Sequence, residues 1–213
     1  MRRLSLLALL LVVATAAGCA TPNMSKHEKF LEAAPRSILI VPVINKSVDV
    51  TAADYMLSTI SVPLAERGYY VFPINAVKRM LEDDGLSDSS MVHNASAIKL
   101  AALFGADAVL YVTINQWDAK YMVTTTHVTV SIKYQIRSGK TNEVLWENSE
   151  RLVYAPKNNG GGIAGLIVGA IHAAITKAAP NYMPLAHQVN DKALNVYPGR
   201  GIPLGPYAQE QAR

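Results

Sequence analysis

The chain has 213 residues, half of them hydrophobic, and carries 20 basic and 16 acidic side chains. This length and apolar content suit one domain with a sizeable core. The cations are scattered among acids and form no stripe that could follow phosphates, which argues against nucleic acid as a partner.

The first 18 residues have the organisation of an export signal. Two arginines precede an apolar run over residues 4–13, and small residues lead to Gly18 and Cys19. A buried first helix is the alternative, but the run lacks polar alternation and is too short to span a bilayer. Without residues 1–18 the formal charge falls from 20 − 16 = +4 to 18 − 16 = +2, because both arginines are removed.

The residues around Cys19 predict a lipid anchor. Ala16-Ala17-Gly18-Cys19 resembles the lipobox of bacterial lipoproteins, with Ala16 where leucine is commoner. That resemblance implies cleavage between Gly18 and Cys19 and covalent lipid on the Cys19 sulfur. No other cysteine is present to compete for Cys19 in a disulfide. Ala20 resembles lipoproteins sorted to the outer membrane, so we expect a periplasmic domain anchored there, with surface exposure left open.

Composition divides the mature chain into three parts. Residues 19–35 are polar and predict a short lipidated tether, with a brief helix over residues 26–33. Residues 36–197 predict the folded domain. Residues 198–213 are rich in glycine and proline and predict a flexible tail that cannot pack against a core.

The first half of the domain predicts a β-α-β-α-α order. The apolar run at residues 38–41 indicates a strand buried on both faces. A helix follows, in which Thr51 and Asp54 resemble a capping box and Gly68 the residue after its end. Residues 69–72 suit a second strand. Two further helices are predicted to begin at Asn75 and Ser96 and to end at glycines 85 and 105.

The second half predicts a hairpin. Residues 108–114 suit a buried strand, and residues 126–137 alternate strictly, with the odd-numbered residues from Thr129 to Arg137 facing solvent. A turn at residues 138–142 leads to a return strand over residues 143–154, with Val144, Trp146 and, after a change of phase, Leu152 facing inward. We therefore predict a single α/β domain with a mixed sheet and packed helices.

A very apolar helix is predicted over residues 163–178, before a last helix over residues 185–196. Residues 160–165 match G-x-G-x-x-G, but no parallel strand or acidic residue follows as a dinucleotide site requires. Small residues instead recur every four positions and form one face of the helix. This face favours close packing against another element of the core. Contact between copies, and hence a homo-oligomer, is the first alternative, and contact with the membrane is the second. The members of the face are Gly161, Gly165, Gly169 and Ala173.

No catalytic or metal-binding pattern stands out. The five histidines show no paired metal spacing, and no cysteine remains beside Cys19. Asp83 and Asp84 precede a glycine as residues at a helix end do, and residues 87–90 suit a solvated loop. We expect no enzyme activity, no cofactor and no small-molecule substrate.

Three segments in order resemble the domain shared by the curli-secretion lipoprotein CsgG and the amino-terminal domain of TolB. They are the strand and turn of residues 37–47, the Gly105-Ala106-Asp107 strand start, and the hairpin turn of residues 138–146. The whole chain resembles a family of short bacterial lipoproteins that includes a neisserial surface antigen and is encoded beside CsgG-like proteins. Residues 117–127 and 137–143 leave no room for the long hairpins from which CsgG builds its pore.

This resemblance implies an accessory of an envelope secretion or assembly apparatus, with a CsgG-like lipoprotein as one expected partner. A protein-binding regulator of an envelope enzyme such as a peptidoglycan synthase is the alternative. A tether of about sixteen residues, spanning at most roughly 55 Å, is short for an activator that reaches across the periplasm.

Overall fold

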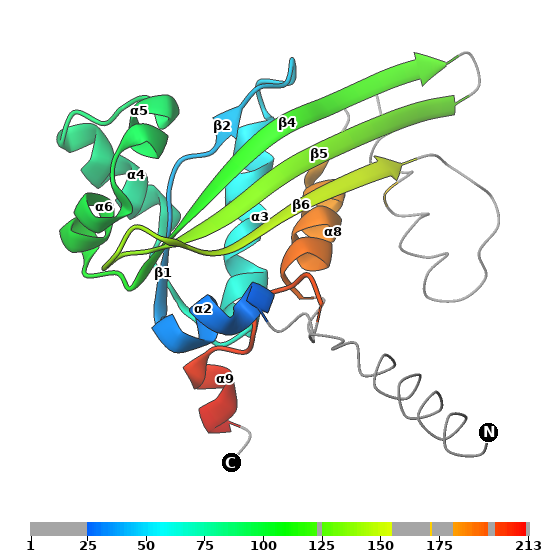
Figure 1. The fold of residues 1–213 in the computed structure, drawn as a ribbon. Coiled ribbons are helices and arrows are strands. Elements are labelled where there is room, and N and C mark those ends of the chain that lie inside the picture. The colour runs from blue at the N-terminus through cyan, green and yellow to red at the C-terminus, as the bar shows by residue number, and fades with distance from the viewer. Residues whose placement is uncertain (1–24, 123–124, 155–170, 172–180, 196–198, 212–213) are drawn as a thin grey trace, which may run out of the picture.

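We describe the protein from a computed structural model, which places residues 25–122, 125–154, 171, 181–195 and 199–211. A mixed six-stranded sheet forms its centre (Figure 1). The strand order is β3-β1-β4-β5-β6, and short β2 also pairs with β4. The fold class predicted from the sequence, one α/β domain with a mixed sheet and packed helices, is confirmed.

The sheet combines a parallel and an antiparallel half. β1 (Ser37–Ile40) pairs in parallel with β3 (Tyr70–Val71) and β4 (Ala108–Met122), and β2 (Ile44–Asn45) pairs in parallel with β4. β5 (Thr125–Ser138) and β6 (Val144–Tyr154) continue as an antiparallel hairpin. Both halves share β4.

The parallel half is buried on both faces, as the apolar run predicted. Ile38 and Ile40 lie in one core cluster, whereas Leu39 and Val41 lie in another. Successive side chains of a strand point to opposite faces. Each face of β1 therefore needs its own layer of helices.

The larger core lies under α3 (Ala52–Glu66) and α8 (Met183–Leu194), which pack on each other over one face. α4 (Ile74–Asp83), α5 (Ser89–Asn94) and α6 (Ala97–Phe104) cover the other face at the β1 end. Beyond this second layer, the outer face of the β4–β6 hairpins is left without helices among the described residues (Figure 1).

The register of β5 is confirmed. Val128, Val130 and Ile132 are fully buried, and Lys133 between the inward positions is exposed. β4 is eight residues longer than residues 108–114, because it continues past a register shift at Asn115 as the partner of β5. The strand signal weakens there because the sequence becomes polar.

The return strand β6 corrects one prediction. A register shift beside Leu145 places Val144 opposite Arg137, so the change of phase falls before Trp146. Trp146 and Leu152 then share one phase, and the positions between them on that side are Asn148 and Glu150. Both polar side chains are buried.

Several helix ends confirm the predictions and two do not. Ser96 caps α6 by accepting a hydrogen bond from the Ile98 amide, and Gly105 ends it in the left-handed region. The Thr51 side chain makes no capping bond; its hydroxyl donates to Asp49 instead. α4 begins at Ile74 after Pro73, one residue ahead of the predicted Asn75 cap.

The first and last described segments pack against the domain. α2 (Ser25–Ala33) buries Phe30 in the main core, which confirms the predicted helix within the tether. The prediction of a tail that cannot pack is wrong for the described residues: Ile202 is fully buried, and α9 (Pro206–Gln211) follows. The physical reason is backbone contact, because Gly205 donates to the Arg67 carbonyl at 2.7 Å and Tyr207 to that of Gly68 at 3.2 Å.

Candidate functional site

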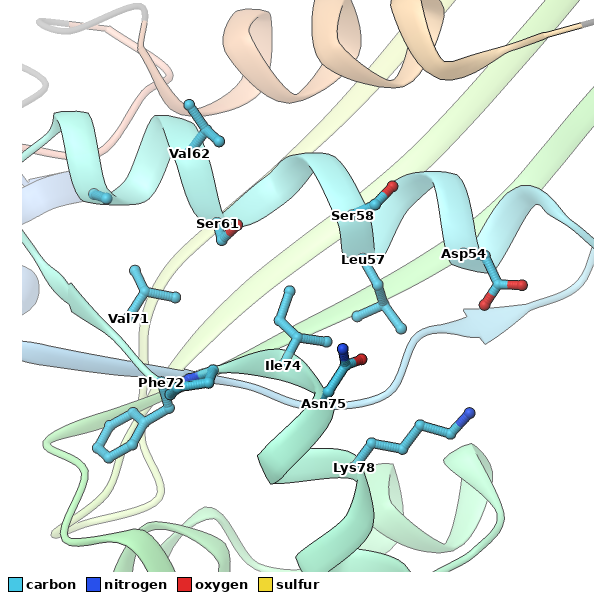
Figure 2. Close-up of a pocket in the computed structure, with 12 residues that line it drawn as sticks. Asp54, Leu57, Ser58, Ser61, Val62, Val71, Phe72, Ile74, Asn75 and Lys78 are labelled. Atoms are coloured by element: carbon cyan, nitrogen blue, oxygen red, sulfur yellow. The ribbon is translucent and has the colours of Figure 1, made fainter.

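A groove of about 650 Å³ lies between α3 and the segment that runs from β3 into α4 (Figure 2). α3 supplies one wall and residues 71–78 supply the other. Figure 2 shows Leu57 of α3 and Ile74 of α4 pointing toward one another across it. The groove is therefore formed by two elements that the sheet holds at a fixed separation.

The amphipathic pattern of α3 explains how this wall stays accessible beside the core. Met56, Ile60 and Leu64 are fully buried in the core beneath the helix. Leu57 and Ser61 each follow a buried residue by one position, which turns them about 100° round the helix to its flank. They are half-buried at the groove instead of joining the core.

The polar groups of the groove gather at one end. Asp54 and Lys78 both lie there in Figure 2, from opposite walls. Lys78 pairs with Glu82 one helical turn on, at 4.0 Å. Ser58 donates its hydroxyl to the Tyr55 carbonyl at 3.1 Å. The lining contains two serines, Ser58 and Ser61, and no histidine or cysteine.

The groove adjoins an edge of the sheet. In the described sheet β3 is the last strand on this side and pairs only with β1. Tyr70 on it is 51% exposed and packs edge-on against Phe72, with ring centroids 5.0 Å apart. An edge strand offers backbone groups to which an extended segment can add, and pockets beside it can take alternate side chains.

A second cluster lies where α5 meets β4 on the other face of the sheet. His93 packs edge-on against the Tyr111 ring, and the Arg137 guanidinium lies 5.5 Å from that ring's centroid. His93 Nε2 lies 2.9 Å from the Pro42 carbonyl oxygen, so we assign Nε2 as the protonated nitrogen.

Burial controls the titration of this cluster. It lowers the pKa of His93, and the nearby Arg137 charge acts in the same direction, against the Pro42 hydrogen bond. It raises the pKa of Tyr111 to about 12. The Tyr111 hydroxyl is enclosed without a hydrogen-bond partner. The His93 ring and the Tyr111 phenol are therefore both neutral. We interpret the cluster as part of the packing between α5 and β4.

A buried polar seam joins α8 to the sheet. Glu150 of β6, almost fully buried, pairs with Lys192 and Arg200 at 3.2 Å each. Tyr134 donates to Asn190 at 2.8 Å, and Asn190 donates to Thr59 of α3 at 2.9 Å. Burial, and secondarily the Glu150 charge, raises the pKa of Tyr134 well above its ordinary value.

Sequence reasoning missed both the groove and this seam. The seam had a usable signal, because polar residues at inward positions of a strand require buried partners. Continuing the Trp146 phase would have placed Asn148 and Glu150 inside. The groove had no such signal in the sequence, because α3 and α4 are brought together only by tertiary packing.

The residues singled out from the sequence lie mostly outside the described part of the chain. Gly18 and Cys19 belong to residues 1–24, and the small-residue face belongs to residues 155–180, of which only Ile171 is described. Ile171, from the opposite, apolar side of that segment, is buried in the main core. Cleavage, lipidation and close packing of the small-residue face therefore stay predictions.

The described residues show neither a metal cluster nor a membrane-spanning helix. Among the described residues no group of three or more potential ligands is placed to hold a metal ion. Within the same part of the chain, no helix combines the length and apolar character needed to cross a membrane.

Comparison with known proteins identifies relatives along most of the chain. The family described as "Putative lipoprotein GNA1162-like" matches residues 26–207. A lipoprotein of Neisseria meningitidis serogroup B is 32% identical over 192 residues, which are 88% of this chain and 88% of that protein. The match includes α2 and the C-terminal segment, in agreement with their packing.

A solved structure of the same family has the same fold. The crystal structure of lipoprotein GNA1162 from Neisseria meningitidis is 34% identical, with a TM-score of 0.57, over 64% of this chain and 95% of that one. The PelC dodecamer of Paraburkholderia phytofirmans is 14% identical, with a TM-score of 0.47, over 74% of this chain and 83% of that one. The second likeness is too distant to carry over an assembly state.

Proposed function

Because the chain belongs to the GNA1162-like lipoprotein family, we propose that it is a lipid-anchored, non-catalytic accessory protein of the cell envelope. It docks an extended segment of a partner protein in the groove between α3 and α4. The observation that carries this proposal is a groove with apolar surface beside an edge of the described sheet.

The chemistry of the groove suits a peptide. Leu57, Val71 and Ile74 offer apolar surface, whereas Asp54 and Lys78 offer opposite charges at one end. Mostly apolar pockets with a few polar groups bind through the apolar part and gain orientation from the polar part. A strand adding to β3 would satisfy its own backbone hydrogen bonds there.

The anchor in this proposal is Cys19, with Ala20 favouring the outer membrane and a periplasmic domain. α2 begins at Ser25, so the chain between anchor and packed helix is residues 20–24, which is 24 − 19 = 5 residues. The six Cα–Cα steps from Cys19 to Ser25 span at most about 20 Å. A tether this short suits a component that acts beside its membrane and disfavours an activator that crosses the periplasm.

Site-specific photocrosslinking of the full-length protein in its own envelope tests the groove. A photoreactive phenylalanine at Ser61 is expected to give a protein adduct of defined mass, identified by mass spectrometry. The same residue at Ser149, exposed on β6, is the matched control and is expected to give none. Equal adducts from both positions would contradict docking in the groove.

Self-association is a separate part of the proposal and rests on the sequence alone. The small-residue face of residues 161–173 is its predicted contact. Gly165→Leu and Gly169→Leu are expected to abolish assembly while the monomer stays folded, as judged by sedimentation alongside thermal melting. A monomeric parent whose leucine variants melt early would assign that face to the core instead.

A further inference from the structure

Exposed apolar side chains gather around one hollow at the end of the molecule where α2 and α9 lie. The hollow, of about 270 Å³, lies between α2 and the C-terminal segment. Leu31 and Leu204, which line it, are 55% and 46% exposed. Tyr207 follows the lining residue Pro206 and is 39% exposed. We call Leu31, Leu204 and Tyr207 the terminal patch.

The lining of this hollow differs from that of the other hollows. All nine lining residues are apolar, proline, glycine or tyrosine, and none is charged. The neighbouring hollow beyond α2 is lined by Lys29, Glu32 and Lys140 among others. Large exposed apolar groups that share one site mark a contact surface, whereas scattered ones do not.

The chain length outside the structure limits what this surface can contact. The predicted anchor at Cys19 lies six Cα–Cα steps before Ser25, the first residue of α2, or about 20 Å when fully extended. Leu31 lies six residues further along the helix, about 9 Å along its axis. The Leu31 end of the terminal patch is therefore held within about 29 Å of the lipidated residue for the lifetime of the anchor.

Its residue types match a membrane interface. The Arg36 guanidinium lies 5.4 Å from the centroid of the Tyr207 ring. Tyrosine and arginine both combine an apolar body with a polar end, and they concentrate at the level of lipid headgroups. Leucines beside them can enter the boundary with the acyl chains.

We infer that the terminal patch rests in the interface of the bilayer that holds the Cys19 lipid. This contact would be reversible, because a small leucine cluster alone binds a membrane weakly. It would add to the covalent anchor and would not replace it. It would also orient the domain. α2 and α9 lie at one end of the molecule, whereas the free end of the β4–β5 hairpin lies at the other (Figure 1). This inference rests on the lipid anchor of the proposed function.

The test uses the full-length lipidated protein in vesicles of phosphatidylethanolamine and phosphatidylglycerol. Cys19 is the only cysteine and its sulfur would be blocked by lipid, so Leu31→Cys and Leu204→Cys each provide a unique site for a spin label. Leu103→Cys on α6, where leucine is 40% exposed, is the matched control. Collisions with oxygen and with a water-soluble nickel complex report membrane depth.

We expect labels at 31 and 204 to lose nickel collisions and gain oxygen collisions, while the label at 103 keeps the profile of a solvated site. If the protein floats with the vesicles but the labels at 31, 204 and 103 have the same collision profile, the inference is wrong while the lipid anchor stands. Protection that vanishes when the protein is diluted in lipid would also overturn it and assign the patch to a second copy. Chains that fail to float would overturn the anchor and the inference together.

Discussion

The two edges of the sheet, at β6 and at β3, differ in the elements that pack on them. At the β6 end, α2, α8 and the C-terminal segment all contact the strand or its neighbours. At the β3 end, a two-residue strand borders the groove between α3 and α4. The β6 end is thus tied into the core by packed elements, whereas the β3 end carries the groove that we propose as the docking site.

The C-terminal segment is expected to give the largest stability effect. Ile202→Ala should lower the free energy of unfolding by about 2–5 kcal/mol, because it empties a fully buried site. Deleting residues 199–213 should cost more, since it also removes the acceptors of Trp146 Nε1 and of the Tyr69 hydroxyl. Chemical denaturation measures both effects. If the deletion leaves the free energy of unfolding unchanged, the C-terminal segment is the flexible tail that its composition predicted.

Close backbone contact between the C-terminal segment and the loop that leads into β3 is expected to give the next largest effect. A Cβ at Gly205 would lie 2.3 Å from the Gly68 carbonyl oxygen. Gly205→Ala should therefore cost about 1–3 kcal/mol through overpacking. Gly85→Ala is the control, because its Cβ meets open space and its φ of +81° costs about 1 kcal/mol alone. A thermal melt of Gly205→Ala like that of the parent would exclude tight packing there.

The buried ion pairs of Glu150 should contribute less. Glu150→Gln is expected to cost about 1–2 kcal/mol, because charge-assisted bonds are lost but Lys192 and Arg200 stay partly solvated. Glu147→Gln, which breaks an exposed pair with Lys133, should change stability by less than about 0.5 kcal/mol. If the two variants unfold at the same denaturant concentration, Glu150 does not hold the C-terminal segment.

The smallest expected effect is a pH dependence from the helical layer on the β3 side. The folded pKa of His93 lies below its ordinary value of 6.5, so folding favours the neutral ring. Its contribution is complete above about pH 6.5 and is lost as the pH falls through and below that value. His93→Gln should flatten this part of the stability profile. A profile with the same slope in both proteins would contradict the assignment.

Local signals predicted much of the fold. The apolar run at β1, the alternation of β5 and the glycine after α6 each depend on neighbours in sequence, and each prediction is confirmed. Composition misjudged the C-terminal segment, because Ile202 and Gly205 pack through contacts with residues more than 130 positions away. The groove could not be predicted, since its two walls come together only when the sheet forms.

The central claim is that the β3 end binds a partner through the groove. Once photocrosslinking has identified that partner, its affinity for the purified protein can be measured with Leu57→Lys and with the matched control Leu103→Lys. The account predicts that Leu57→Lys weakens binding at least about tenfold, or about 1.4 kcal/mol, with the fold retained by circular dichroism, while Leu103→Lys binds like the parent. Equal affinity of the parent and both folded variants would contradict it.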